Sequence, residues 1–161
     1  MNFDQSFKSY PRELLQYKPQ MTTQQRSKEL RSYYTGDFSE EFQKRNGART
    51  DRVSEVFSRL SSEAIAFQHA FIADNPNPLG SKHLMDKPAH VERGEYAEFH
   101  ANYHPYFRNF LEKFGYYDIF LVEPENGRVV YSVFKELDFA TSLVDGPVSY
   151  THLTLPTSDL V

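Results

Sequence analysis

Two histidines with the spacing of helical metal ligands stand near the middle of the chain. His100 and His104 lie four residues apart in the segment HANYH, so a helix would place both imidazoles on one face. No glutamate follows His100 directly, so the metalloprotease pattern is absent, and Pro105 disturbs the backbone at His104. Histidines beside an aromatic stripe more often hydrogen-bond to nearby backbone or carboxylates. We therefore expect neither a metal nor another cofactor, and keep His100 and His104 as the only metal candidates.

Carboxylates gather in the last third of the chain, where a pair of them could perform acid–base chemistry. They are Asp118, Glu123, Glu125, Glu136 and Asp138. The chain has no nucleophile motif, no glycine-rich phosphate loop and no HExxH motif. We therefore expect that this chain is not an enzyme. A soluble metal-dependent hydrolase built around His100 and His104 is the alternative from another class.

Composition limits the class of protein. The chain has 161 residues, of which 39% are hydrophobic and 25% charged, which suits one folded domain. The net charge of −4 and the lack of a Lys/Arg cluster argue against binding to nucleic acid. Without cysteine there is no disulfide framework, zinc knuckle or thiol nucleophile. Aromatic residues make up 16% of the chain, and such rings need a core or an interface.

No segment predicts a membrane helix or a targeting signal. No run approaches the roughly 18 apolar residues that a membrane helix needs. The first ten residues, MNFDQSFKSY, have neither a basic start nor an apolar stretch. We therefore expect no targeting or transmembrane segment in this chain.

The elements that must position these side chains begin with helices. Residues 1–50 predict short, marginal helices, one capped by Thr22 or Thr23 and one starting at Ser39. Apolar residues at steps of three and four then predict a single amphipathic helix from Asp51 to Asp74. The segment NPNPLG ends it.

A second aromatic-rich helix is predicted from Glu95 to Phe114. Its apolar stripe includes Tyr96, Phe99 and Phe107. Pro105 lies inside it and predicts a kink or a restart, and Gly115 is the expected C-terminal stop.

After Gly115 the hydrophobic period changes from about four to two. The runs YDIFLV (117–122) and RVVYSVF (128–134) predict two strands, and EPENG predicts the turn of a bulged β-hairpin with Gly127 in the left-handed conformation. The following segment KELDFATSLVDGP predicts no regular element. A lone hairpin is marginally stable and leaves unpaired edges, so we expect the start of a sheet that the chain does not complete.

The last fourteen residues differ from all that precede them. The segment VSYTHLTLPTSDLV (148–161) has one charge, Asp159, and no hydrophobic period. Its start resembles the translation of a transposase-type sequencing-library adapter. We therefore expect residues 148–161 to be a non-native tail and residues 51–147 to be an incomplete domain. The other reading is a natural β-like tail, because Thr, Leu and Tyr are common in strands.

Two long stretches resemble a known sensor family, namely FQHAFIADNPNPLGSKHLMD (67–86) and YAEFHANYHPYFRNFLEKFGYYDIFLVEPENGRVVYSVFKELDFATSL (96–143). The short helices before Asn46 add a weaker likeness. Together they resemble the extracytoplasmic sensor domain, of the Cache (PAS-like) type, of bacterial transmembrane receptors such as methyl-accepting chemotaxis proteins. Related arrangements occur in nucleotide cyclases and other membrane signalling proteins.

The resemblance implies an α+β fold: N-terminal long helices followed by the first hairpin of a PAS-like antiparallel sheet, here truncated. It implies a membrane helix on each side of the domain in the full-length receptor, a periplasmic location for this segment, and an unidentified small-molecule ligand. In such domains the pocket lies between the sheet and the segment after its early strands. The residues of this chain that would contact the ligand are Tyr131, Lys135 and Asp138. Lys135 and Tyr131 could supply the cation and the donor that a carboxylate or amino acid needs. The simpler reading is that Tyr131 packs in the sheet and Lys135 is exposed.

The resemblance also implies a homodimer in the full-length receptor. Sensors of this class commonly pair through their first long helix, so the stripe of Asp51 to Asp74 is a candidate seam. Core packing against the hairpin is the simpler account of the same residues. The predicted function is that of a fragment of a ligand-sensing domain, most simply from a methyl-accepting chemotaxis protein, with the sensor of a cyclase or other membrane signalling enzyme as the alternative. A third option is a helical interaction module whose hairpin augments the sheet of a partner.

Overall fold

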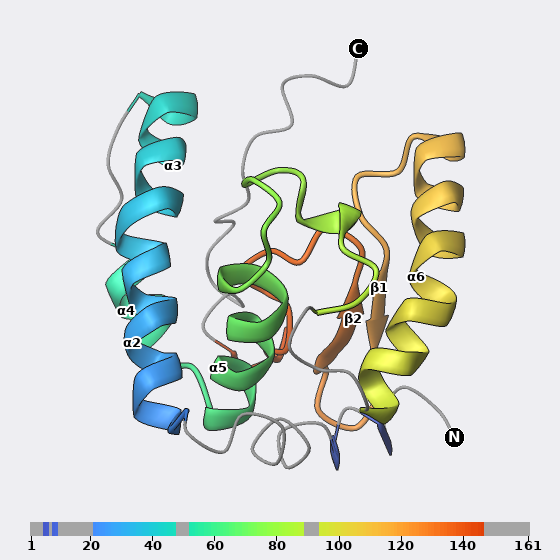
Figure 1. The fold of residues 1–161 in the computed structure, drawn as a ribbon, viewed down its shortest axis with the longest axis horizontal. Helices are drawn as coiled ribbons and strands as arrows, with labels where there is room; N and C mark the ends of the chain where they lie inside the picture. Colours follow the sequence, from blue (N-terminus) through green and yellow to red (C-terminus); the bar gives the residue numbers. More distant parts are fainter. Residues whose placement is uncertain (1–4, 7, 10–20, 48–51, 89–93, 147–161) are drawn as a thin grey trace.

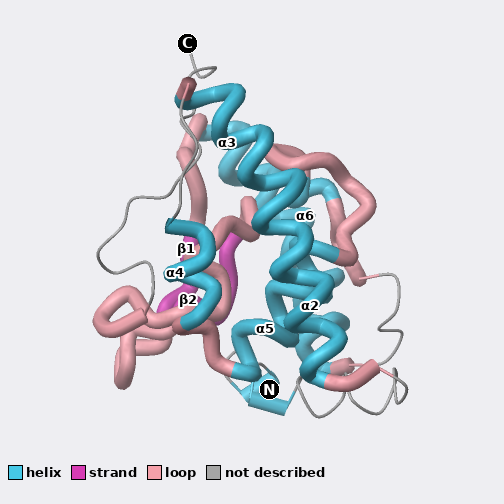
Figure 2. The backbone as a smooth tube through the Cα atoms, turned by 90° about the vertical axis from the view of Figure 1, so that its left-hand side faces the viewer, coloured by secondary structure: helices cyan, strands magenta, loops and turns pink. Residues whose placement is uncertain are grey.

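The protein is described by a computed structural model, which covers residues 5–6, 8–9, 21–47, 52–88 and 94–146. A long helical rod forms one side, a second long helix the opposite side, and a short helix and a β-hairpin lie between them (Figure 1). Figure 2 looks onto the rod, with α4 and the hairpin beside it. The rod consists of α2 (Thr23–Tyr33), the π-helix η1 (Tyr34–Phe38) and α3 (Ser39–Asn46). The other helices are α4 (Arg52–Ser58), α5 (Ser62–Gln68), the π-helix η2 (His69–Ala73), the 3₁₀ helix η3 (Lys82–Leu84) and α6 (Glu95–Phe114).

The rod begins with the cap that the sequence predicts. The Thr22 side chain accepts a hydrogen bond from the Gln25 amide, and the Gln25 side chain accepts one from the Thr22 amide, which forms a capping box. Gly47 closes α3 in the left-handed conformation, with φ of 73°. The two predicted helices are therefore present, but they are joined, because η1 continues the helical backbone between them.

The single helix predicted from Asp51 to Asp74 is wrong, because two helices form instead. The α-helical backbone stops after Ser58, and Ser61 restarts it by accepting a hydrogen bond from the Ala64 amide at 3.1 Å. A serine with extended backbone geometry is a strong helix N-cap, and here it interrupts an otherwise continuous apolar stripe. The stripe still packs into the core of this chain, and its buried members are Val53, Val56, Phe57, Ala64, Phe67 and Phe71.

Helix α6 runs through Pro105 without a restart, so of the kink or restart predicted there the restart does not occur. A proline removes one backbone donor from a helix, but the remaining turns of this twenty-residue helix keep theirs. Its predicted ends are confirmed, since Gly115 caps it in the left-handed conformation with φ of 66°.

The predicted hairpin is confirmed, with shorter strands. Strand β1 (Phe120–Val122) pairs antiparallel with β2 (Val129–Ser132), a register irregularity lies between Leu121 and Val122, and Gly127 has φ of 67°. The strands end early because the carboxylate of Asp118 accepts the backbone N–H groups of Ile119, Val133 and Phe134, which then cannot join the ladder.

The segment after β2 is more ordered than the sequence predicts. Residues 140–143 run beside β2, where Arg128 and Ser142 form an isolated antiparallel bridge. The Val129 amide donates to the Thr141 carbonyl at 2.8 Å, and the Ala140 amide donates to the Val129 carbonyl at 3.0 Å. The described part of the chain is thus a mixed α+β structure with one small antiparallel sheet. The expected non-native tail, 148–161, and the expected domain boundary at residue 50 lie outside the described residues.

Gln68 connects three elements in the core. Its side-chain amide donates to the carbonyls of Leu137 and Phe139 at 3.0 and 2.7 Å, and its oxygen accepts from the Tyr34 hydroxyl at 2.8 Å. This buried side chain therefore joins α5 to the rod and to the segment that follows the hairpin.

We expect Gln68→Leu to destabilise the protein by about 2 kcal/mol, because it leaves two carbonyls and one hydroxyl buried without partners. Urea unfolding followed by circular dichroism measures this loss. Tyr34→Phe is the matched control: it removes one hydrogen bond and should cost about 1 kcal/mol. Equal losses in the two variants would contradict the connecting role of Gln68.

Within the described residues, no helix has both the length and the apolar character needed to cross a membrane.

Candidate functional site

The predicted site residues from α6 lie in the core. His100 and His104 are both fully buried, and their rings stack with centroids 4.3 Å apart. The helical spacing therefore brings the two imidazoles to one face, as the sequence predicts. That face is packed against the hairpin, since the centroid of the Tyr131 ring lies 5.7 Å from that of His100 and 5.9 Å from that of His104.

The hydrogen bonds of His104 occupy both of its ring nitrogens. Nε2 lies 2.6 Å from the His83 carbonyl, which can only accept, so Nε2 carries the proton. Nδ1 then accepts from the Tyr131 hydroxyl at 2.7 Å. Neither nitrogen has a lone pair left for a metal ion.

His100 has one nitrogen in use. Its Nδ1 donates to the Asp86 carbonyl at 2.7 Å, which leaves Nε2 as an acceptor, and this buried atom has no hydrogen-bond partner among the described residues. No group of three or more possible metal ligands exists in the part of the chain that the structure describes.

Both histidines are held neutral. Burial, aided by the charge of Lys135, lowers the pKa of His100 well below its usual range. The same causes lower the pKa of His104 to about 3. Two stacked neutral imidazoles are a structural part of the core rather than an acid–base pair at neutral pH.

Lys135 lies in the interior, contrary to the simpler reading that it is exposed. It is 3% exposed, has φ of 59°, and its Nζ donates to the Ser132 carbonyl and lies 4.4 Å from the Tyr131 ring centre. Burial lowers the pKa of Lys135 to about 7, and the opposing charge comes from Asp118. The structure thus brings together two of the three predicted ligand-contact residues, Tyr131 and Lys135.

The charge of Asp138 affects a different set of side chains. It raises the pKa of Tyr34 and of Glu136, and one of its oxygens, Oδ1, is buried without a hydrogen-bond partner among the described residues. Burial, followed by repulsion from Asp118, raises the pKa of Asp138 to about 7. Burial and the Asp138 charge likewise raise the pKa of Glu136 to about 7.

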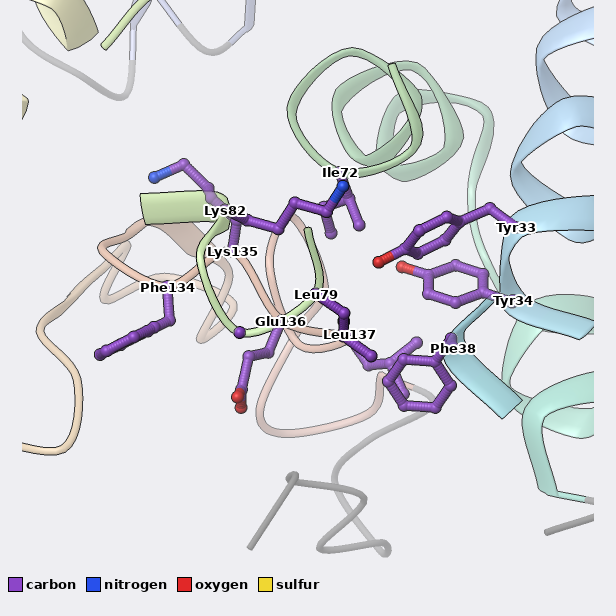
Figure 3. A pocket seen from close by; sticks show the side chains of 11 residues that line it. Tyr33, Tyr34, Phe38, Ile72, Leu79, Lys82, Phe134, Lys135, Glu136 and Leu137 are labelled. Atoms are coloured by element: carbon purple, nitrogen blue, oxygen red, sulfur yellow. The ribbon is translucent and has the colours of Figure 1, made fainter. Parts of the chain in front are cut away.

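A narrow pocket lies where the rod meets the segment after β2 (Figure 3). Tyr33, Tyr34 and Phe38 form one wall, and residues 134–137 form the wall opposite, which includes Lys135 and Glu136. Its enclosed space is about 20 Å³, enough for one water molecule. The remaining lining residues are Ile72, Leu79, Gly80 and Lys82.

The polar residues in the lining of this pocket are basic, acidic and phenolic: two lysines, one glutamate and the tyrosines. Lys82 is 5% exposed, and its Nζ donates to the Asn75 carbonyl at 2.9 Å and lies 5.1 Å from the Tyr33 ring centre. The Tyr33 hydroxyl is buried and has no hydrogen-bond partner among the described residues. Glu136 supplies a carboxyl group, and Tyr117 donates to it at 3.0 Å. Such a set can hold a small molecule that has both an acidic and a basic group.

Two π-helical turns form part of the wall. η1 contributes Tyr34 and Phe38, and η2 contributes Ile72. A π turn is a strained insertion in a helix and is frequent at functional sites, because it can return to α-helical geometry with a shift in register. The pocket is therefore lined by the two least regular turns of the long helices.

The sequence analysis missed Tyr33 and Lys82 as site residues. Nothing in their local pattern marks them, because Tyr33 lies on a helix with a mixed surface and Lys82 lies in a polar connector. They meet the segment after β2 only in the folded chain. Glu136 was named among the carboxylates, but its neighbours could not be read from the sequence.

Comparison with known proteins adds no relationship. No protein-family model matches this sequence, and no significant similarity was found to curated proteins or to solved structures.

Proposed function

We propose that this chain is part of a ligand-sensing domain of a membrane-bound signal-transduction receptor, of the Cache (PAS-like) type found in methyl-accepting chemotaxis proteins. The segment would then be extracytoplasmic, in the periplasm, and would bind a small molecule without changing it. The observation that carries the proposal is the pocket between the rod and residues 134–137. Its lining includes Lys82, Glu136 and Tyr33, whose hydroxyl has no hydrogen-bond partner among the described residues, and it lies beside two π turns.

The chemistry of the pocket supports binding rather than catalysis. The imidazoles of His100 and His104 are neutral and packed away from the pocket lining. Lys82, whose Nζ lies 5.1 Å from the Tyr33 ring centre, and Glu136 both line the pocket, so a ligand with a carboxylate and an ammonium group could pair with both. The metal-dependent hydrolase considered above gains no support from this arrangement.

The pocket also suggests how a ligand would produce a signal. Its enclosed space of about 20 Å³ is smaller than an amino acid, so the walls must separate to admit one. A register shift in η1 would move α3 relative to α2, because these segments form one continuous rod. A ligand that binds the open arrangement better than the closed one shifts the population toward it.

Binding can be tested on the purified chain with the twenty amino acids and with short mono- and dicarboxylates. We expect a saturable thermal shift with at least one of these compounds, confirmed by calorimetry, because ligands that bind only the folded state stabilise it. Tyr33→Phe should weaken that binding by about fivefold, the equivalent of one hydrogen bond.

The matched control is Tyr106→Phe, which removes a hydroxyl from a tyrosine that is 75% exposed on α6 and outside this pocket. It should leave the affinity unchanged. If no compound in the panel binds, or if the two variants bind equally well, the pocket is not the ligand site.

A further inference from the structure

Lys82 is a buried amine that lines the pocket between the rod and residues 134–137. Its Nζ donates to the Asn75 carbonyl at 2.9 Å, and no carboxylate of the described residues forms an ion pair with it. Burial lowers the pKa of Lys82, and the charge of Asp37 opposes this effect. An amine removed from water without an ion pair favours its neutral form, which is the nucleophilic one.

The loop before η3 fixes the position of this amine. The Asn75 side chain donates to the carbonyls of Phe71 and Lys82 at 3.0 and 2.9 Å, and Lys82 Nζ donates back to the Asn75 carbonyl. Two hydrogen bonds in opposite directions therefore join Asn75 to Lys82. They occupy one N–H of the amine, so the lone pair of the neutral form stays available to a ligand.

An unpartnered hydroxyl lies on the ring beside the amine. Lys82 Nζ is 5.1 Å from the centre of the Tyr33 ring, whose hydroxyl points into the pocket (Figure 3). This hydroxyl is buried and has no hydrogen-bond partner in the described part of the chain. Burial, followed by the charge of Asp37, raises the pKa of Tyr33 above its ordinary value, so the hydroxyl keeps its proton at neutral pH. The separation leaves room for a carbonyl group with its carbon toward Nζ and its oxygen toward the hydroxyl.

The other buried lysine lacks this arrangement. Lys135 Nζ lies among the rings of Tyr131, Phe139 and Phe71, with centres at 4.4, 5.3 and 5.8 Å. The hydroxyl of Tyr131 donates to His104 Nδ1 at 2.7 Å and is therefore not available to a carbonyl oxygen. Of the two buried amines, only that of Lys82 has a proton donor without another acceptor beside it.

The rest of the lining limits the compound that such a pair can take. Phe38, Ile72, Leu79 and Leu137 make most of the wall apolar, which favours a hydrocarbon chain over a charged group. The enclosed space of about 20 Å³ admits only a short chain, even when the walls separate.

We propose that Lys82 captures a short aliphatic aldehyde as a reversible Schiff base, with the Tyr33 hydroxyl as proton donor to the carbonyl oxygen. This inference rests on the proposed function in one respect, which is that the pocket admits small molecules. It adds a covalent step and a chemical class of ligand that non-covalent binding does not require.

The reaction needs no oxidant or reductant. The Nζ lone pair forms a bond to the carbonyl carbon, the π pair of the C=O bond moves to the oxygen, and that oxygen takes a proton from Tyr33, which regains one from Nζ. The nitrogen lone pair then forms the C=N bond as the hydroxyl group leaves. Tyr33 gives this group a proton and recovers the last proton of the nitrogen, so one water is released. Hydrolysis reverses the steps and returns the aldehyde unchanged.

Reductive trapping tests the proposal on the purified full chain. The protein is incubated near neutral pH with propanal and cyanoborohydride, which converts an imine into a stable propyl amine, and mass spectrometry of peptides locates the propyl groups. We expect Lys82 to react at least about tenfold faster than Lys44, whose side chain is 78% exposed, because more of Lys82 is neutral. Lys135 should remain unmodified, and in concentrated urea all three lysines should react alike.

Tyr33→Phe should slow the reaction at Lys82 by more than about tenfold, because the carbonyl oxygen loses its proton donor. The variant loses only a hydroxyl without a partner among the described residues, and thermal unfolding checks that it is folded. The matched control is Tyr106→Phe, at a tyrosine that is 75% exposed and outside this pocket, which should react as the unmodified protein does.

Equal rates at Lys82 and Lys44 in the folded chain, or an unchanged rate at Lys82 in Tyr33→Phe, would overturn the proposal. The panel of amino acids and carboxylates contains no aldehyde, so the two tests are separate. A chain that binds a panel compound but forms no propyl amine at Lys82 overturns the covalent capture and leaves the proposed function in place. Rapid trapping at Lys82 without binding of any panel compound supports the capture alone.

Discussion

Replacing Lys135 with methionine is expected to stabilise the protein at pH 7 by about 2 kcal/mol and to remove most of its pH dependence above neutrality. Methionine has a similar length and fills the same space without an ammonium group that must be desolvated. The aromatic rings around Nζ, those of Tyr131 and Phe139 with centres at 4.4 and 5.3 Å, would pack against the thioether instead. Asp118 loses an opposing charge but keeps its four donors, which limits the offset.

The direction of the pH dependence follows from the lowered pKa of Lys135. Its pKa is about 7 in the folded chain and 10.5 as the ordinary value, so between these limits the unfolded chain binds more protons than the folded one. The free energy of unfolding therefore rises with pH from about 7 to about 10, by up to about 1.4 kcal/mol per pH unit. This contribution is lost progressively as the pH falls from about 10 to about 7 and is absent at lower pH.

The buried carboxyl and imidazole groups change the free energy of unfolding at pH values below about 7, so their effect does not overlap that of Lys135 between pH 7 and 10. The raised pKa values of Glu136 and Asp138, about 7 each, make stability fall as pH rises from about 4 to 7. The lowered pKa values of His100 and His104 act in the opposite direction below about 6.5. Lys82, whose pKa burial also lowers, adds to the rise above neutrality.

Chemical denaturation at several pH values between 7 and 10 measures the effect. Lys135→Met should give a flatter profile than the unmodified protein, and Lys82→Met is the control for the part that Lys82 contributes. If Lys135→Met destabilises the protein and leaves the slope unchanged, the lysine is not a desolvated cation. A variant that is more stable but no longer binds ligand would fit a residue retained for function at the expense of stability.

Asp118→Ala is expected to have the largest destabilising effect of any single substitution considered for this chain, about 3 to 5 kcal/mol. The carboxylate accepts from the backbone amides of Ile119, Val133 and Phe134, at 2.6, 2.9 and 3.3 Å, and from the Ser132 hydroxyl at 2.8 Å. Removing it leaves four donors without their acceptor and takes the opposing charge away from Lys135.

Urea unfolding should separate the parts of this effect. Asp118→Asn keeps one acceptor oxygen and should lose less than the alanine variant. Ser132→Ala removes one donor to Asp118 and the acceptor of the Lys135 amide, and should lose about 1 to 2 kcal/mol. Asp145→Ala, at an exposed aspartate, is the control and should change stability by less than about 0.5 kcal/mol. If Asp118→Ala matches that control, the carboxylate does not hold the ends of the hairpin.

Local pattern was enough to predict the elements whose signal lies within a few residues. The bounds of α6, its end at Gly115 and the hairpin with Gly127 in the left-handed conformation follow from hydrophobic period and turn chemistry. Pattern was not enough where one polar side chain interrupts an element. Ser61 divides the predicted helix, and Asp118 shortens both strands, because each offers a backbone donor an alternative partner.

The site could be predicted only in part, because its residues come from separate segments. The i, i+4 spacing of His100 and His104 correctly predicts a shared face, but only the packed hairpin places the Tyr131 hydroxyl on His104. Likewise, no spacing relates Tyr33 and Lys82 to Glu136, which share a pocket.

The sequence by itself determined α6, the helix cap at Thr22, the hairpin and the residue types available for binding, because hydrophobic period, caps and turns act between near neighbours. Only the tertiary structure decided that Lys135 is buried beside Tyr131 and that Tyr33, Lys82 and Glu136 line one pocket. Burial and charge depend on side chains brought together from distant segments, and the desolvation that lowers the pKa of Lys135 to about 7 exists only once the core has closed around it.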